Sequence, residues 1–309
     1  MILNTGSRTD IPAFYSAWFF NRVRAGEALV RNPYRRDELV RYSLSPDVVD
    51  VLVFCTKNPE PMLSRLQEIK AYRQFWGVTI TPYGEDIEPG VPSPKDVVES
   101  VKQLSGIVGK DAVAWRYDPV LFYGRYGLDF HLRAFSELCR ELSGYVSFAV
   151  VSFIDLYQKT VRNFPEARKP DSHEEDILTA EFVRTARRYG LAVRLCCERP
   201  ELSAYGADVS GCLTKEVLEK AAGISLSVPR SKSKARPVCA CLLGADIGAY
   251  NSCPHGCRYC YANYDKALAK ANYLRHDPGS PLLIGWPGPG DHIRDASQES
   301  WLSQQLELF

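Results

Sequence analysis

Short apolar runs alternate with longer amphipathic segments along most of the chain. The runs are rich in Val, Ile, Phe and Tyr, as buried strands are. We expect strands at residues 2–5, 51–54, 76–81, 113–117, 145–152 and 191–197, and weaker ones at 224–228 and 245–250. Apolar residues at helical spacing predict helices at residues 61–72, 94–107, 130–142 and 174–189.

The order of these elements predicts the fold class. Successive strands stand roughly 30 to 45 residues apart with a helix between them, a pattern typical of βαβ units and a parallel sheet. Six such strands favour an α/β fold of the TIM-like (β/α) barrel type over an open sheet. No Gly-x-Gly-x-x-Gly motif follows the first strand, which argues against a dinucleotide-binding fold. We expect residues 1–228 to form the barrel body and residues 229–309 to form a cysteine-rich segment packed on its mouth.

Polar side chains recur where the predicted strands end. Lys57 follows the second strand, Arg116 and Asp118 lie at the end of the fourth, and Asp155 follows the fifth. In a (β/α) barrel these carboxyl ends meet at one mouth, where active sites are built. We therefore expect these four side chains to orient a polar substrate. The alternative is that each is a solvated loop residue at the start of the next helix.

Composition excludes several classes of protein. Of the 309 residues, 45% are hydrophobic and 24% are charged, which is the balance of a globular protein and not of a disordered or collagen-like chain. The net charge is only +1, which does not favour nucleic acid as a partner. No apolar run approaches the roughly 20 residues that span a bilayer, and no secretory signal opens the sequence. We expect a cytoplasmic protein with no membrane partner.

Cysteines are concentrated near the carboxyl end, where five of the ten fall within 22 residues. In a reducing compartment they favour metal or redox chemistry over disulfides. In the segment Cys253-Pro-His-Gly-Cys257-Arg-Tyr-Cys260, short spacers let three sulfurs turn toward one iron–sulfur cluster and leave one metal position without a ligand from this loop. The alternative is a structural zinc site in which Cys257 and Cys260 join Cys239 and Cys241.

The C-x3-C-x2-C spacing, with Tyr259 before its last cysteine, resembles the signature of radical S-adenosylmethionine enzymes. The resemblance implies that Cys253, Cys257 and Cys260 hold a 4Fe-4S cluster whose fourth iron binds the methionine part of S-adenosylmethionine, and that Tyr259 lies against the adenine. It implies that the reduced cluster releases a 5′-deoxyadenosyl radical, which abstracts hydrogen from a small-molecule or peptide substrate. An electron donor such as a flavodoxin or ferredoxin would supply the reductant.

Most of the chain also resembles a bacterial and archaeal family of unknown function, DUF1848. Four segments carry this resemblance: Ser7 to Tyr15, Phe54 to Pro59, Arg116 to Pro119, and Asp246 to Tyr250 before the cysteine loop. The family has carboxyl-terminal cysteines that resemble the cluster loop of the radical enzymes.

The cysteine loop stands late in the chain, whereas in ordinary radical enzymes it follows the first barrel strand. Only 49 residues follow Cys260. A circularly permuted or partial barrel reconciles the two, with residues 245–250 as its first strand and residues 2–5 as the next. The helix after this first strand would begin with Asp265 to Tyr273. Residues 6–10 would then replace the segment that holds the methionine amine, so Ser7 and Asp10 are candidates for cofactor binding.

Four further cysteines have the composition of a second metal site: Cys197, Cys212, Cys239 and Cys241. We expect them to hold an auxiliary 4Fe-4S cluster, with a zinc site or ordinary thiols as alternatives. Cys196 adjoins Cys197, but alternation along a strand directs the two side chains to opposite faces, so only one should be a ligand. We expect Cys55 and Cys139 in the core, and His255 as a solvent-facing loop residue.

Three functions compete on this sequence. The leading hypothesis is a radical S-adenosylmethionine enzyme. The second is an iron–sulfur DNA-repair protein of the photoproduct-lyase kind, which needs a basic groove. The third is a non-catalytic zinc or iron–sulfur module.

Overall fold

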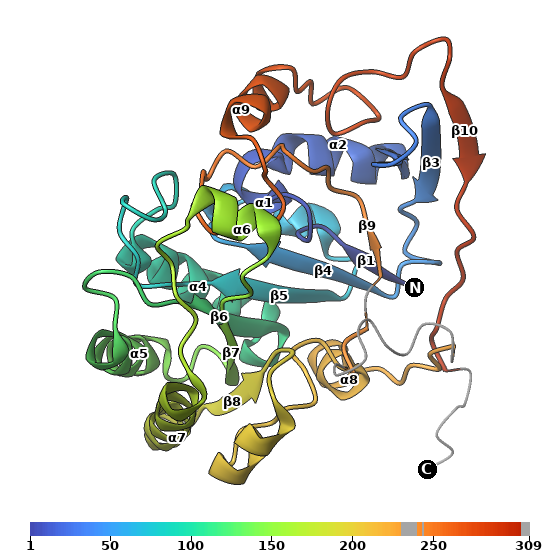
Figure 1. Cartoon of the computed structure of the whole chain (residues 1–309). Coiled ribbons are helices and arrows are strands. Elements are labelled where there is room, and N and C mark those ends of the chain that lie inside the picture. The colour runs from blue at the N-terminus through green and yellow to red at the C-terminus, as the bar shows by residue number, and fades with distance from the viewer. Residues whose placement is uncertain (230–239, 243, 304–309) are drawn as a thin grey trace, which may run out of the picture.

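The computed structural model describes residues 1–229, 240–242 and 244–303. Within them, the main sheet has seven parallel strands (Figure 1): β1 (Ile2–Asn4), β4 (Val51–Thr56), β5 (Gln74–Thr79), β6 (Val113–Val120), β7 (Phe148–Phe153), β8 (Ala192–Leu195) and β9 (Ala245–Asp246). Their spatial order is β8-β7-β6-β5-β4-β1-β9. A small sheet in the order β10-β3-β2 contains β2 (Glu27–Arg31), β3 (Glu38–Ser43) and β10 (His292–Asp295). The fold is therefore α/β, as predicted.

Helices flank the main sheet and connect its strands (Figure 1). They are α1 (Ile11–Phe14), α2 (Ser16–Ala25), α3 (Glu60–Leu63), α4 (Pro94–Val108), α5 (Leu128–Leu142), α6 (Gln158–Asn163), α7 (Ser172–Arg188), α8 (Lys215–Ala222) and α9 (Lys266–Leu274), with short 3-10 helices η1 (Leu66–Ile69), η2 (Lys110–Ala112) and η3 (Pro200–Tyr205). Helix α4 begins where its sequence predicts, because the Ser93 hydroxyl accepts the Asp96 N–H at 3.2 Å. The predicted helix at residues 61–72 is divided into α3 and η1.

The two faces of the main sheet differ in chemistry. On one face, Phe54 of β4 stacks on Trp76 of β5 with ring centres 4.0 Å apart. The next positions along these strands, Cys55 and Gly77, are paired on the opposite face. A Cβ added to Gly77 would lie 3.6 Å from Cys55 Sγ and 3.0 Å from Arg116 Cδ, so these three residues share that face. Because side chains alternate along a strand, the aromatic face packs in the core while a polar face gathers sulfur and charge.

The strand before the cysteine loop lies beside the first strand of the chain. In β9, Ala245 pairs in parallel with Leu3, and Asp246 with Asn4. Strand β1 pairs in turn with β4. The neighbours expected for a permuted order therefore do pair. Strands β8 and β9 form the two edges of the sheet, and no pairing between them occurs among the residues described, so closure into a barrel stays a prediction.

The segment at residues 229–309 contributes to both sheets where it is described. It supplies β9 to the main sheet and β10 to the small one, and helix α9 begins after Asp265, as predicted. The predicted domain boundary at residue 228 stays a prediction. The weak strand candidate at residues 224–228 is wrong, because only Leu226 forms an isolated bridge there, to Leu302.

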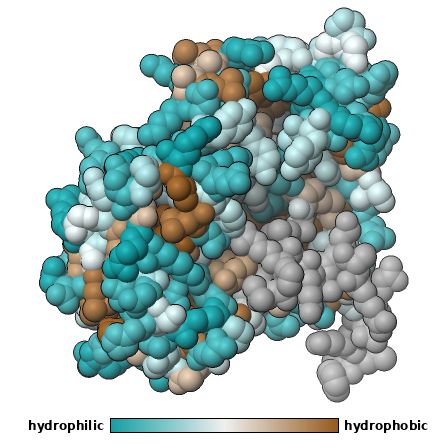
Figure 2. All heavy atoms as spheres, in the orientation of Figure 1, coloured by the Kyte–Doolittle hydropathy of each residue, from teal (hydrophilic) through white to brown (hydrophobic). Residues whose placement is uncertain are grey.

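None of the helices in the described ranges has the length and apolar character needed to cross a bilayer. The face in Figure 2 is largely hydrophilic, with separate apolar patches, one of them over α6, where Val161 is exposed.

Candidate functional site

Three cysteines lie together on the loop between β9 and α9, and we call Cys253, Cys257 and Cys260 the first thiol group. All three are free thiols. Burial raises the pKa of Cys253 well above its usual value, and the nearby charges of Asp10, Cys257 and Cys260 raise it further. Burial also raises the pKa of Cys257 and of Cys260. The sulfurs are thus within electrostatic reach of one another, and a bound cation is needed to hold them as thiolates at neutral pH.

Backbone N–H groups point at these sulfurs. Cys260 accepts hydrogen bonds from the backbone of Ala262 and Asn263, and Cys253 accepts one from His255. Hydrogen bonds to cysteine sulfur are a recurring feature of iron–sulfur sites. Within the described part of the chain, no three His, Cys, Asp or Glu side chains are spaced to hold a single metal ion. A cluster is bound differently from a single zinc ion, because each thiolate takes a different iron.

His255 connects the cysteine loop to neighbouring loops. Its Nδ1 lies 2.9 Å from the Gly90 carbonyl oxygen, and its Nε2 lies 2.9 Å from Asp10 Oδ2. Both ring nitrogens are therefore within hydrogen-bond distance of an oxygen of a neighbouring loop. The ring also meets Phe14 edge to face at 4.6 Å and is only 3% exposed. The expectation of a solvent-facing His255 is therefore wrong, because both polar atoms have partners inside the protein.

Asp10 joins three loops at the end of the sheet. Its carboxylate accepts four hydrogen bonds: from the Ala13 N–H at 3.1 Å, the Thr56 hydroxyl at 2.6 Å, the Lys57 N–H at 2.7 Å and the His255 ring. A carboxylate has about four acceptor positions, so a cofactor amine would have to displace one of these donors. The geometry gives Asp10 a positioning role, and direct contact with a cofactor stays a prediction.

Lys57 lies in a buried cluster with Glu88 and Tyr259. Its Nζ is 2.9 Å from Glu88 Oε1 and 5.8 Å from the centre of the Tyr259 ring, and the Tyr259 hydroxyl donates to the same Glu88 oxygen. Burial acts to lower the pKa of Lys57, but Glu88 and Cys257 raise it by more, so the ammonium is retained. This ion pair fixes Tyr259 against Tyr83, at 6.2 Å between ring centres. The predicted contact of Tyr259 with adenine stays a prediction.

Ser7 lies between the end of β9 and the cysteine loop. Its N–H donates to Asp246 Oδ2 at 2.8 Å, and its hydroxyl accepts from Asn4 at 2.6 Å. Its carbonyl accepts the Tyr261 hydroxyl at 2.6 Å. Since Tyr261 directly follows Cys260, the structure brings Ser7 next to the first thiol group. Its role as a cofactor ligand stays a prediction.

Helix α6 holds the segment that follows the third cysteine. Its side chains donate to consecutive parts of that backbone: Thr160 to the Tyr259 carbonyl at 3.4 Å, Lys159 to Tyr261 at 3.3 Å, Asn163 to Asn263 at 3.4 Å, and Arg162 to Tyr264. The Asn263 amide closes the loop by donating to the Cys253 carbonyl at 2.7 Å. The cysteine loop is therefore held by hydrogen bonds from the helix that follows β7, in addition to those from the loops that follow β1 and β4.

A second thiol group, defined as Cys196, Cys212 and Cys241, lies beside Arg116. Cys212 Sγ is 3.5 Å from Cys196 Sγ and 3.6 Å from Cys241 Sγ. Arg116 Nη1 is 3.4 Å from Cys212 Sγ, and the same guanidinium pairs with Asp118. Hydrogen bonds from Cys196 and Cys241, and then the charge of Arg116, hold the pKa of Cys212 well below its usual value.

A comparison with protein families bears on both thiol groups. The model of a family described as a domain of unknown function, DUF1848, matches residues 2–262. The chain belongs to the DUF1848 family. The match includes the whole first thiol group and ends just after Cys260. Searches of curated proteins and of solved structures found no match.

The second thiol group of this DUF1848 protein differs from the predicted one. The predicted ligand is Cys197, whereas the sulfur in contact with Cys212 belongs to Cys196. Cys197 has a φ of 61°, in the left-handed region, so regular strand geometry ends there. Cys197 as a ligand stays a prediction, and Cys239 lies outside the described residues.

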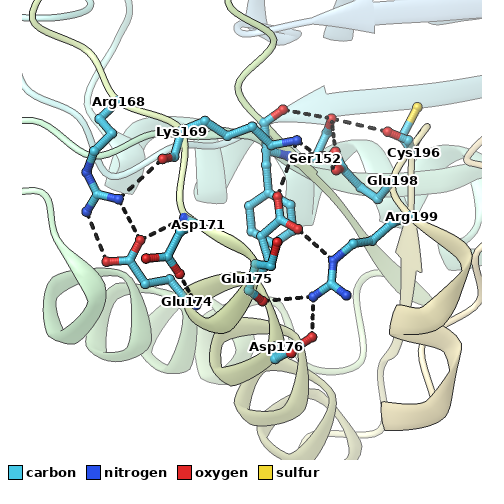
Figure 3. A network of polar contacts seen from close by, with 12 residues as sticks. Ser152, Arg168, Lys169, Asp171, Glu174, Glu175, Asp176, Cys196, Glu198 and Arg199 are labelled. Atoms are coloured by element: carbon cyan, nitrogen blue, oxygen red, sulfur yellow. Dashed lines mark hydrogen bonds and ion pairs between the residues drawn. The ribbon is translucent and has the colours of Figure 1, made fainter.

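A buried carboxylate lies behind the second thiol group (Figure 3). The Ser152 hydroxyl is 2.9 Å from Glu198 Oε1 and 3.2 Å from the Cys196 carbonyl oxygen, and Phe153 N–H donates to Glu198 at 2.8 Å. Burial raises the pKa of Glu198 to about 7, although Phe153, Lys169 and Ser152 act against this shift. A group that titrates near neutral pH is thus joined to the backbone of Cys196.

Three of the four predicted substrate residues are within electrostatic reach of one another, because Asp118 pairs with Arg116 and its charge raises the pKa of Lys57. Arg116 and Asp118 pair with each other beside the second thiol group, and Lys57 lies with Glu88 beside the first. Asp155 is on the exposed loop after β7, where it accepts the Tyr157 hydroxyl at 2.9 Å. The roles of all four residues in substrate binding stay predictions.

Two important side chains carry no local signal in the sequence. Glu88 lies 31 positions from its partner Lys57, and Asp246 lies 238 positions from Arg8, whose Nε it accepts at 3.0 Å. Both pairs depend on loops that meet only in the folded chain. The sequence gives an indirect sign of Asp246, because this residue begins one of the four segments that resemble the DUF1848 family.

Proposed function

We propose that this DUF1848 protein is a radical S-adenosylmethionine enzyme. The observation that carries the proposal is the first thiol group, which presents three half-buried cysteines from one eight-residue loop. His255 is the other candidate ligand on that loop, but its two nitrogens are engaged by Gly90 and Asp10. A 4Fe-4S cluster bound by Cys253, Cys257 and Cys260 would then keep one iron open for the amino and carboxylate groups of the cofactor.

We further propose that the sheet is a partial, circularly permuted (β/α) barrel. Read from β9, the spatial order β9-β1-β4-β5-β6-β7-β8 is the order of a barrel whose first strand stands late in the sequence. The loop after this first strand carries the first thiol group. In such a barrel the carboxyl ends of the strands surround the active site, and here they bear Lys57, Arg116 and Asp118.

When bound, the cluster and S-adenosylmethionine supply the 5′-deoxyadenosyl radical, and the protein supplies position. Asp10 and His255 hold the cysteine loop against the ends of β1 and β4. Arg116 and Asp118 are proposed to hold polar groups of a small-molecule or peptide substrate through charge-assisted hydrogen bonds. A flavodoxin or ferredoxin is the proposed electron donor. The same proposal includes an auxiliary 4Fe-4S cluster with the ligands that the sequence predicts, Cys197, Cys212, Cys239 and Cys241.

The proposal is tested by anaerobic reconstitution with iron and sulfide, reduction with dithionite, and chromatography after addition of S-adenosylmethionine. We expect 5′-deoxyadenosine and methionine in equal amounts. The matched variant Cys257→Ser should form neither, while Cys139→Ser, which changes a buried thiol far from the loop in sequence, should form both.

Two other outcomes would replace this proposal. A colourless protein with zinc bound by four sulfurs would identify a non-catalytic module. DNA binding that weakens steeply with salt, together with 5′-deoxyadenosine formation, would identify the DNA-repair alternative, because neutralised phosphates release counterions.

A further inference from the structure

We infer that Cys196 is a thiolate ligand of a second metal centre, together with Cys212 and Cys241. The inference extends the proposed function to the identity of a ligand, and it concerns a soft metal centre that is either zinc or iron–sulfur. It rests on three observations: the segment that Arg194 and Cys196 face, the distances between the sulfurs, and the positive charge of Arg116 beside them.

The direction of β8 brings Cys196 to Cys212. Arg194, two residues earlier, donates from Nε to the Gly211 carbonyl at 2.8 Å and from Nη2 to the Ser210 hydroxyl at 2.9 Å. Residues two apart on a strand share a face, and the Cys196 N–H still bonds to the Val151 carbonyl at 3.0 Å in the β7 ladder. Arg194 and Cys196 therefore face the same segment, and the residue after Gly211 is Cys212.

As they stand, the three sulfurs do not form a site for a single metal ion, but two of the distances between them are close to those in a zinc site. Cys212 Sγ touches the other two sulfurs at 3.5 and 3.6 Å. Thiolates bound to one tetrahedral zinc at 2.3 Å lie about 3.8 Å apart, so these contacts would have to widen by only a few tenths of an ångström for zinc. A cluster would need a larger movement, because each thiolate takes a different iron.

The surroundings of this group suit thiolates. The backbone N–H groups of Cys212 and Leu213 lie 3.1 and 3.2 Å from Cys241 Sγ, and both donate to it. Arg116 Nη1 lies 3.4 Å from Cys212 Sγ on the other side. N–H groups and a guanidinium offset the negative charge that several thiolates bring to a metal. Figure 3 shows the Cys196 sulfur directed away from the side chains of Glu198 and Ser152.

The test uses the full chain with Cys253, Cys257 and Cys260 all changed to Ser, so that any bound metal reports on the second group alone. The protein is purified anaerobically, loaded with zinc or with iron and sulfide, and analysed for metal. We expect about one zinc or about four irons per chain, and the two loadings distinguish the two kinds of centre. Adding Cys196→Ser should remove the metal, whereas adding Cys139→Ser should not.

A second measurement needs no change at Cys196. Maleimide labelling followed by peptide fragmentation separates Cys196 from Cys197, and Cys196 should label roughly tenfold more slowly with metal than after chelation. Retention of metal by the Cys196→Ser protein, equal labelling of Cys196 in both states, or failure of both zinc and iron to bind would overturn the inference. None of these readouts involves 5′-deoxyadenosine, so the proposed function and this inference can fail separately.

Discussion

The two thiol groups lie at the same end of the sheet but are assembled differently. The first comes from one loop of eight residues, and burial raises the pKa of each of its thiols. The second combines the end of β8 with the segment before α8 and residue 241, and Arg116 helps to hold the pKa of Cys212 well below its usual value. The comparison teaches that local spacing reveals one site, while the other depends on which segments meet in the folded chain.

Changing one ligand of the first thiol group should have the largest effect. Cys257→Ser leaves two thiolates for the cluster, so we expect iron to fall by about four per chain and formation of 5′-deoxyadenosine to cease. Iron analysis and chromatography of the reconstituted protein measure both. If the variant forms 5′-deoxyadenosine as fast as the unchanged protein, the first group is not the cluster site.

Removing the buried partner of Asp10 should cost the most stability. The His255 and Asp10 side chains are 4% and 7% exposed. His255→Ala removes one of the four donors to this buried carboxylate, the contact with the Gly90 carbonyl and the packing of the ring against Phe14. We expect a loss of about 3 to 5 kcal/mol in the free energy of unfolding, measured with urea on the metal-free protein.

The comparison for His255→Ala is Lys169→Ala, which removes an exposed charge beside a buried carboxylate near the second thiol group. Lys169 is 40% exposed and lies 3.8 Å from Glu198, so its loss should cost at most about 1 kcal/mol. Equal losses for the two variants would show that His255 does not hold the cysteine loop.

Glu198 should make the region around the second group sensitive to pH. Its pKa in the folded protein is about 7, above the usual 4.5, so folding favours the protonated carboxyl. The protonated carboxyl therefore stabilises the folded protein fully below about pH 4.5, and this contribution is lost as the pH rises through 7. The free energy of unfolding should fall by about 3 kcal/mol over this range. Glu198→Gln keeps the acceptor for Ser152 and Phe153 and should remove this dependence. Urea unfolding of both proteins from pH 5 to pH 8 gives the measurement, and parallel pH curves would contradict it.

The smallest effect is expected where α6 holds the first thiol group. Asn163→Ala removes one hydrogen bond, of 3.4 Å, to the Asn263 carbonyl, so we expect a loss of about 0.5 to 1.5 kcal/mol. Amide exchange at residues 261–264 should become faster by a corresponding factor. Gln158→Ala, at an exposed position of the same helix, is the control and should leave exchange unchanged.

Local patterns predicted what depends on near neighbours in the sequence. Apolar runs located the main-sheet strands, Ser93 and Asp265 marked helix starts, and the order of strand and helix predicted a parallel sheet. The pairing of β9 with β1 followed from the late position of the cysteine loop. The small sheet was missed, because its short strands contain charged residues and one of its two pairings, β10 with β3, joins segments about 250 positions apart.

The candidate site was less predictable, because its contacts cross long stretches of sequence. His255 looks like an ordinary loop residue until the loops of Gly90 and Asp10 pack on it. Asp10 was correctly placed near the cysteine loop, but its four hydrogen bonds could not be counted from the sequence. The choice between Cys196 and Cys197 required the direction of Arg194, which only the folded β8 provides.

The central claim is that one iron of the first cluster is open to S-adenosylmethionine. Electron paramagnetic resonance of the reduced, reconstituted protein tests it most directly, with spectra recorded before and after the cofactor is added. We predict a 4Fe-4S signal that changes on addition and is absent from the Cys257→Ser variant. A cluster signal that the cofactor leaves unaltered, or a colourless protein that binds only zinc, would contradict the account.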